Sequence, residues 1–123
     1  MSNNPLVSVI VPNYNYERFL DKRMQTILEQ TYRNIEVFLL DDASTDESVS
    51  VMRKWAGQDT RVVDVIVNSD NSGSPFKQWQ KGLERARGKY VWIAESDDYC
   101  ELSFLETLVS LLRFFFRHGK IIL

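Results

Sequence analysis

Three carboxylates, Glu95, Asp97 and Asp98, lie close together directly after the β-forming segment 90–93. Because unpaired charge is costly inside a core, the chain must leave the interior there, at the carboxyl end of a strand. In an open α/β sheet, ligands bind at that edge. Clustered carboxylates can hold a hard divalent cation such as Mg²⁺ or Mn²⁺, which prefers oxygen and often carries a phosphate. A polar strand end with a helix-capping aspartate is the alternative, and these residues alone do not decide between the two.

A second pair of carboxylates, Asp41 and Asp42, follows another β-forming run at 35–40. Ser44 and Glu47 then match a capping box, so we expect a helix to begin there. This segment is predicted to be a strand, a turn and a helix, with two acids at the turn.

The remaining elements are placed from periodicity and turn-forming residues. A β-branched run at 6–11 predicts a strand that is buried on both faces and ends at Pro12, which lacks the N–H that a central strand needs. Asn15 is placed to cap the helix that follows. The other predicted elements are strands at 62–67, 89–94 and 120–123 and helices marked by residues 19–28, 44–57, 76–88 and 101–117. Successive β-then-α units predict one α/β domain over 1–123, Rossmann-like, with a mostly parallel sheet between two helical layers.

Composition argues against several kinds of site. A chain of 123 residues fits one small domain, and a net charge of −2 argues against nucleic-acid binding through phosphate contacts. With Cys100 and His118 as the single cysteine and histidine, an internal disulfide is excluded, and a zinc site or histidine-based triad is disfavoured. The sequence has no signal-peptide pattern and no apolar run of membrane-spanning length. We therefore expect a cytoplasmic protein.

The last predicted helix is apolar around most of its axis and includes Phe114, Phe115 and Phe116. A helix of this kind is buried or covered by another element. The fifth strand breaks off at Leu123, which points to a piece of a longer protein. A homodimer through this helix would explain the same apolar surface, and both explanations stay open.

A nucleotide is the simplest ligand that would account for the polar and aromatic residues expected at this edge of the sheet. A carboxylate can accept the imide N–H of uracil, Tyr14 can lie on the base, and a metal can bridge the acids and a diphosphate. No G-x-G-x-x-G follows the first strand, which disfavours a dinucleotide dehydrogenase, and no P-loop pattern occurs.

Several short segments, in order and with fitting spacing, resemble the family 2 glycosyltransferases of the GT-A fold. They are 7–15 (VSVIVPNYN), 30–32 (QTY), 41–46 (DDASTD), Asn71-x-Gly73 and 88–98 (GKYVWIAESDD). Each is weak alone, whereas the ordered set covers nearly the whole chain and is strong. The resemblance implies inverting, metal-dependent transfer of a sugar from a nucleotide-sugar donor, a UDP-sugar being expected, to a carbohydrate or lipid-linked acceptor in polysaccharide biosynthesis. It allows a place at the inner face of the membrane for the full-length protein.

The resemblance also implies roles for individual residues. The residues implied for donor nucleotide binding are Pro12, Tyr14, Asn15, Asp41, Asp42, Ser44, Asn71, Gly73, Lys77, Glu95, Ser96 and Asp97. Among them, Asp42 would contact uracil, and Lys77 would be a phosphate partner. Asp97 and Asp98 match the D-x-D region and would hold Mg²⁺ or Mn²⁺.

The chain departs from the family pattern in two places. Glu95 stands where the motif more often has aspartate, so we expect it to contact ribose rather than metal. The family's general base and most of its acceptor site follow the D-x-D region, where this chain has only one helix and a strand fragment. Glu101 and Glu106 are candidates for the base only by default. We therefore expect a donor-binding portion whose general base lies beyond Leu123.

Two other functions stay open. A sugar-1-phosphate nucleotidyltransferase has the same sheet and acids, but it should carry a glycine-rich, basic loop after the first strand, where this chain has Pro12-Asn13-Tyr14-Asn15. A non-catalytic nucleotide-binding or interaction module would fit the short length.

Overall fold

Five parallel strands form one sheet in the computed structural model, which describes residues 4–115 and 121–123, with side chains for 4–112 and 121–123. The strands are β1 (Val7–Asn13), β2 (Ile35–Asp41), β3 (Val62–Val67), β4 (Tyr90–Ile93) and β5 (Ile121–Ile122). Their order across the sheet is β3-β2-β1-β4-β5, and every neighbouring pair is parallel. The carboxyl ends of the strands therefore meet at one edge. The strand order reverses between β1 and β4, and open α/β sheets bind ligands at such a point.

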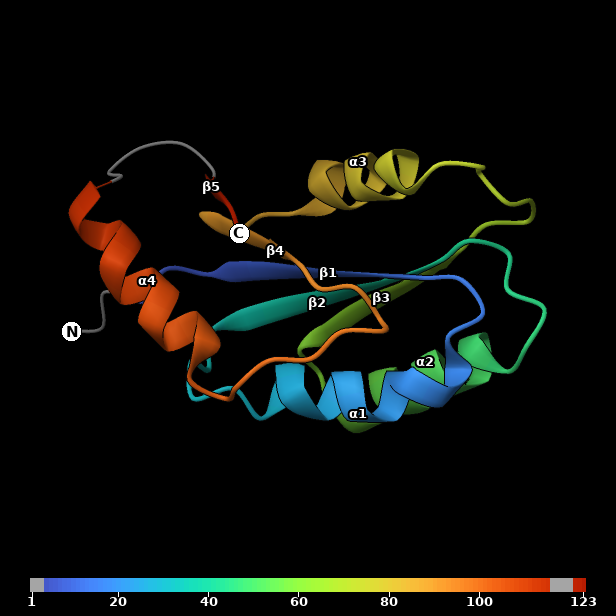
Figure 1. Cartoon of the computed structure of the whole chain (residues 1–123), viewed down its shortest axis with the longest axis horizontal. Coiled ribbons are helices and arrows are strands. Elements are labelled where there is room, and N and C mark those ends of the chain that lie inside the picture. The colour runs from blue at the N-terminus through green and yellow to red at the C-terminus, as the bar shows by residue number, and fades with distance from the viewer. Residues whose placement is uncertain (1–3, 116–120) are drawn as a thin grey trace.

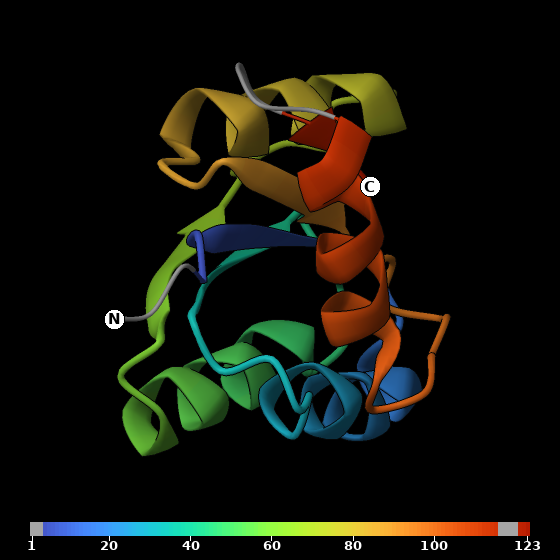
Figure 2. The same cartoon turned by 90° about the vertical axis from the view of Figure 1, so that its left-hand side faces the viewer.

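Helices cover both faces of the sheet. In Figures 1 and 2, α1 (Glu17–Leu28) and α2 (Ser48–Gln58) lie on one face and α3 (Pro75–Arg85) on the other, while α4 (Phe104–Phe115) runs along the β4 side. This three-layer arrangement confirms the predicted fold class. Within the described ranges, no helix combines the length and the apolar character that a bilayer crossing would need.

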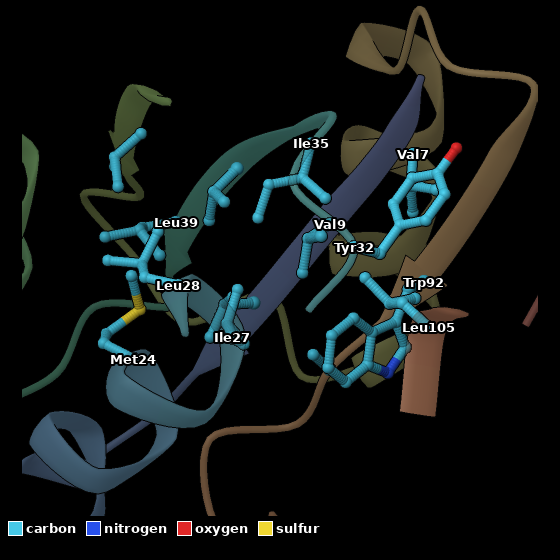
Figure 3. Close-up of a cluster of buried hydrophobic side chains, with 14 of the residues drawn as sticks. Val7, Val9, Met24, Ile27, Leu28, Tyr32, Ile35, Leu39, Trp92 and Leu105 are labelled. Atoms are coloured by element: carbon cyan, nitrogen blue, oxygen red, sulfur yellow. The ribbon is translucent and has the colours of Figure 1, made fainter. Parts of the chain in front are cut away.

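The larger core lies between the sheet and the α1–α2 layer. Figure 3 shows Val9 of β1 and Leu39 of β2 near Met24 and Ile27 of α1. Leu105, at the start of α4, belongs to the same core. Burial of each such aliphatic side chain stabilises the fold by roughly 1.5–3 kcal/mol, so this layer fixes the strands that carry the candidate site.

A smaller core holds α3 against the opposite face. Ile10 of β1 and Val91 of β4 are buried there beside Ala86. Gly82 of α3 lies directly on Ile10, because a Cβ atom added to it would stand 2.4 Å from the Cγ2 of Ile10. The absence of a side chain at Gly82 therefore lets the helix approach the sheet closely.

Some element boundaries differ from the sequence predictions. Strand β1 does not end at Pro12 but continues to Asn13. Its pairing with β4 ends at Ile10, and beyond that point the carbonyl of Pro12 accepts a hydrogen bond from the hydroxyl of Ser96. The missing N–H of proline is tolerated because no β4 ladder reaches it. The third helix ends at Arg85 rather than at Gly88.

Two aromatic residues that mark predicted helices, Phe19 of α1 and Phe76 of α3, are exposed. The side chains of Phe114 to Phe116 and of His118 lie outside the described residues. The predictions made for them stay predictions.

Candidate functional site

A pocket of about 410 Å³ opens at the carboxyl edge of the sheet, between the ends of β1, β2 and β4 and the start of α3. A volume of this size is within the usual range for small-molecule sites. Its lining consists of Pro12, Asn13, Tyr14, Tyr16, Asp42, Asn71, Gly73, Ser74, Pro75, Gln78 and Glu95. The strand ends that were singled out for their polar residues therefore converge on one cavity.

The turn after β2 is built around Asp41, which is fully buried. Its Oδ1 accepts from the hydroxyl of Ser44 at 2.6 Å and from Nδ2 of Asn13 at 3.1 Å, and its Oδ2 accepts from the backbone N–H of Ser44 at 2.8 Å. Ala43, between them, adopts a left-handed φ of 64°. Asp41 and Ser44 thus lie behind the pocket and shape the turn that presents the next residue, Asp42.

The loop after β1 is locked to the loop after β2. Asn15 has a left-handed φ of 55°, and its Oδ1 accepts from the backbone N–H of Thr45 at 2.8 Å. Asp46 in turn accepts from the backbone N–H of Glu17 at 3.1 Å and from that of Ser48 at 2.9 Å. The prediction that Asn15 caps its own helix is therefore wrong, because a carboxylate from the neighbouring loop does so.

The capping box predicted at the second helix is also absent. Helix α2 begins at Ser48, and its N-cap residue Glu47 makes no side-chain cap hydrogen bond. The hydroxyl of Ser44 instead serves the carboxylate of Asp41. Asn15 accepts from the backbone of the second loop, and Asp46 accepts from the backbone that follows the first loop. These two contacts hold the mouth of the pocket in place.

Asp42 is almost fully buried in the pocket wall. Its Oδ1 accepts from Nδ2 of Asn68 at 2.9 Å and from the backbone N–H of Ser72 at 2.8 Å, and its Oδ2 accepts from the hydroxyl of Ser72 at 2.7 Å. Burial alone would raise the pKa of Asp42, but these hydrogen bonds and the charge of Lys81 outweigh it and lower the pKa. The structure therefore holds an ionised acceptor at this wall.

Glu95 follows β4 and forms another wall of the pocket. Its Oε1 accepts from the indole N–H of Trp79 at 3.1 Å. Burial raises the pKa of Glu95, and the neighbouring carboxylates Asp97 and Asp98 raise it further, whereas the bond from Trp79 and the charge of Arg23 act in the opposite direction. Trp79 is half-buried and positions this carboxylate.

The segment after Glu95 turns outward. The backbone N–H of Asp98 donates to the carbonyl of Glu95 at 3.2 Å, which closes a tight turn. Asp97 and Asp98 are exposed, and Oδ1 of Asp98 accepts from the backbone N–H of Tyr99 at 2.8 Å. In the described part of the chain, no three His, Cys, Asp or Glu side chains gather closely enough to enclose a metal ion. A cation here would need further oxygen ligands from a bound molecule or water.

The structure distributes the predicted site residues in three ways. Those in the pocket lining are Pro12, Tyr14, Asp42, Asn71, Gly73 and Glu95. Those that support its walls without lining it are Asn15, Asp41, Ser44 and Ser96. Those that are exposed and outside the lining are Lys77, Asp97 and Asp98.

Sequence reasoning missed two lining residues that are buried and polar, Asn13 and Gln78. Asn13 is assigned to a loop because Pro12 is expected to end the strand. Gln78 is not singled out because polar residues are common on surface helices. The available signal was spacing: Gln78 lies one helical turn before Gly82, on the face of α3 that packs against the sheet.

Glu106, a candidate general base by default, lies elsewhere. Its carboxylate accepts from the hydroxyl of Thr31 at 2.7 Å, in the segment that leads into the amino end of β2. This is the edge of the sheet opposite the pocket. The structure therefore removes Glu106 from the candidates.

Comparison with known proteins identifies the family. The profile described as "Glycosyl transferase family 2" matches residues 8–116. The chain belongs to this family. Membership supports a glycosyltransferase over a nucleotidyltransferase, as the segments at β1, β2 and β4 predicted.

Among the relatives of this family 2 chain, the glycosyltransferase GlyG of Streptococcus pneumoniae is 39% identical over 103 residues, covering 84% of this chain and 34% of GlyG. Of the solved structures, residues 1–349 of S. aureus TarS in complex with UDP match with a TM-score of 0.79 and 29% identity, over 88% of this chain and 32% of that one. The mannosyltransferase PcManGT of Pyrobaculum calidifontis, in complex with GDP-Man and Mn²⁺, matches with a TM-score of 0.71 and 30% identity, over 80% of this chain and 29% of that one. The chain thus spans about a third of the length of GlyG.

Proposed function

We propose that this chain is the donor-binding part of an inverting glycosyltransferase that moves a sugar from a UDP-sugar to an acceptor hydroxyl. The observation that carries the proposal is the pocket at the carboxyl ends of β1, β2 and β4, with the buried, ionised Asp42 in its wall. The similarity to a TarS structure that contains UDP supports a uridine nucleotide as ligand.

The uracil base would bind between Tyr14 and Asp42. Tyr14 is 45% exposed beside the pocket, which leaves ring surface available for stacking on a base. A carboxylate has about four acceptor positions, and protein donors occupy three of those on Asp42. The remaining position can accept the N3–H of uracil. Pro12 and Asn15 would complete the base and ribose end of the site.

The diphosphate would lie toward the end of β4. Asp97 and Asp98 offer exposed carboxylate oxygens, the ligand type that Mg²⁺ and Mn²⁺ prefer. Mg²⁺ is usually held by one or two carboxylates together with substrate phosphates, so a pair without a third protein ligand fits this cation. When bound, it would act as a Lewis acid toward the leaving diphosphate. Asn71 and Gly73 would stand beside the phosphates, and the exposed Lys77 would contribute charge.

The residues of this chain would bind and orient the donor. Glu95 would contact ribose, with its carboxylate held by Trp79. An inverting transfer also needs a carboxylate in line behind the acceptor hydroxyl. We expect that base, and most of the site for a carbohydrate or lipid-linked acceptor, in sequence beyond Leu123, and we place the full protein in polysaccharide biosynthesis at the cytoplasmic side.

The test is calorimetric titration of UDP in Mn²⁺ and in chelator. We expect binding that depends on the metal, and Asp97→Ala/Asp98→Ala should reduce the affinity in Mn²⁺ by about tenfold or more, equivalent to about 1.4 kcal/mol or more. The matched control is Glu29→Ala/Glu84→Ala, which removes two exposed carboxylates outside the pocket lining, one directly after α1 and one in α3. Equal affinities for the Asp97/Asp98 variant and the wild type would remove these acids from the site.

A further inference from the structure

Two buried polar atoms in the pocket lining have no hydrogen-bond partner among the described residues. They are Oδ1 of Asn13 and Nε2 of Gln78, and the two side chains are only 4% and 3% exposed. Leaving a buried donor or acceptor unpaired is energetically costly. Such atoms in the wall of a cavity point to a ligand that pairs with them.

The orientation of the Gln78 amide follows from its neighbours. Lys81 can only donate, and its ammonium group contacts Oδ1 of Asn68. The Nδ2 of Asn68 must then face the other way, where it donates to Oδ1 of Asp42 at 2.9 Å and to Oε1 of Gln78 at 3.0 Å. Turning the Gln78 amide over would bring two N–H groups together. The free atom of Gln78 is therefore a donor.

Asp42 and Gln78 are adjacent in this arrangement, because the same nitrogen of Asn68 donates to both. The pocket wall thus presents an ionised acceptor beside an unpaired N–H donor. The complementary ligand has an N–H group next to an acceptor atom. Uracil has this pattern at N3–H and its flanking carbonyls, and cytosine has it at its amino group and bare N3. The similarity to a TarS structure that contains UDP favours uracil.

We infer that Gln78 is a base-specificity residue, which donates from Nε2 to the uracil carbonyl beside the N3–H that Asp42 accepts. This inference depends on the proposed nucleotide site. It assigns selection of the base to a side chain on α3, in addition to the acids at the strand ends. Gly82 allows α3 to lie close enough to β1 for Gln78 to reach the pocket wall.

Calorimetry of UDP, CDP and GDP in Mn²⁺ tests the inference with Gln78→Met, which keeps the length of the side chain and removes the donor. We expect Gln78→Met to weaken UDP by about tenfold and CDP by less than about threefold. The matched control is Gln80→Met, an exposed position on the same helix, which should bind UDP as the wild type does.

Several results would overturn the assignment. Unchanged UDP affinity in Gln78→Met would remove Gln78 from base recognition, and equal losses for UDP and CDP would mean that Gln78 only supports Asp42 through Asn68. Guanine also has a carbonyl next to an N–H, so Gln78-dependent binding that favours GDP would overturn the choice of uracil. A wild-type chain that binds none of the three nucleotides would defeat the proposed function as well, which separates the two failures.

A second measurement needs no variant. The side-chain amide of Gln78 in the ¹⁵N-labelled wild type should shift on titration with UDP and Mn²⁺, because its N–H groups gain an acceptor. An unshifted Gln78 amide at saturating UDP would contradict the inference even if Gln78→Met failed to fold.

Discussion

Gly82→Ala tests how closely α3 must pack for the site to form. The new Cβ would stand 2.4 Å from Cγ2 of Ile10 and 3.0 Å from its Cγ1 and Cδ1, and Ile10 is fully buried. Overpacking of this kind costs about 1–3 kcal/mol, while alanine gains about 1 kcal/mol over glycine inside a helix. We expect a net loss of up to about 2 kcal/mol in the free energy of unfolding, measured by urea denaturation.

Two further variants isolate the cause. Gly57→Ala in α2 is the matched control, because a Cβ there meets no atom within 4 Å, and it should leave stability unchanged or slightly raised. Ile10→Ala alone should cost about 2–5 kcal/mol. In that background, Gly82→Ala should become stabilising, since all three crowded atoms are gone. A stabilising Gly82→Ala in the wild-type background would refute the reasoning.

The same substitution should reach the site. Gly82 lies one turn after Gln78 on α3, so a helix displaced outward carries Gln78 away from Asn68 and the pocket wall. We expect Gly82→Ala to weaken UDP binding, whereas Gly57→Ala should not.

Two more predictions concern carboxylates. Asp42→Asn should weaken UDP more than CDP in calorimetric titration, because cytosine has no N3–H to lose, and equal losses would mean that Asp42 does not contact the base. Glu36 is buried and accepts from Ser8 at 2.6 Å and from the backbone and side chain of Arg87 at 2.9 Å each. Burial would raise the pKa of Glu36, but these bonds and the Arg87 charge lower it overall. Since the folded-state pKa lies below the unfolded value, this stabilisation is present above the unfolded pKa, near 4.5, and is lost as the pH falls through the folded value. Urea denaturation from pH 7 to pH 3 should therefore show a shallower acid-side loss for Glu36→Gln, and an identical slope would contradict this.

The sheet and the position of the pocket were predictable from short-range patterns. Apolar runs that end in Asp41 and in Glu95 predict strands whose polar ends meet at one edge, and the structure has them there. Buried parallel strands need this hydrophobic pattern, so local sequence determines them strongly.

The helix caps were not predictable in the same way. Asn15 and Ser44 have the right residue types for capping, but each bonds to the opposite loop or to Asp41, and α1 is capped by Asp46. Capping patterns consider only neighbours in sequence, whereas these partners come from a loop that only the folded sheet brings close. The donor on Gln78 has the same origin, since Lys81 and Asn68 fix its orientation through space.

The most direct test of a uridine nucleotide site at the carboxyl edge of the sheet is a crystal structure of this chain with UDP and Mn²⁺. We predict density for uracil between Tyr14 and Asp42 and for the metal at Asp97 and Asp98. Nucleotide bound instead at the opposite edge, in the cavity of about 420 Å³ beside Thr31 and Glu106, would contradict the assignment of the site.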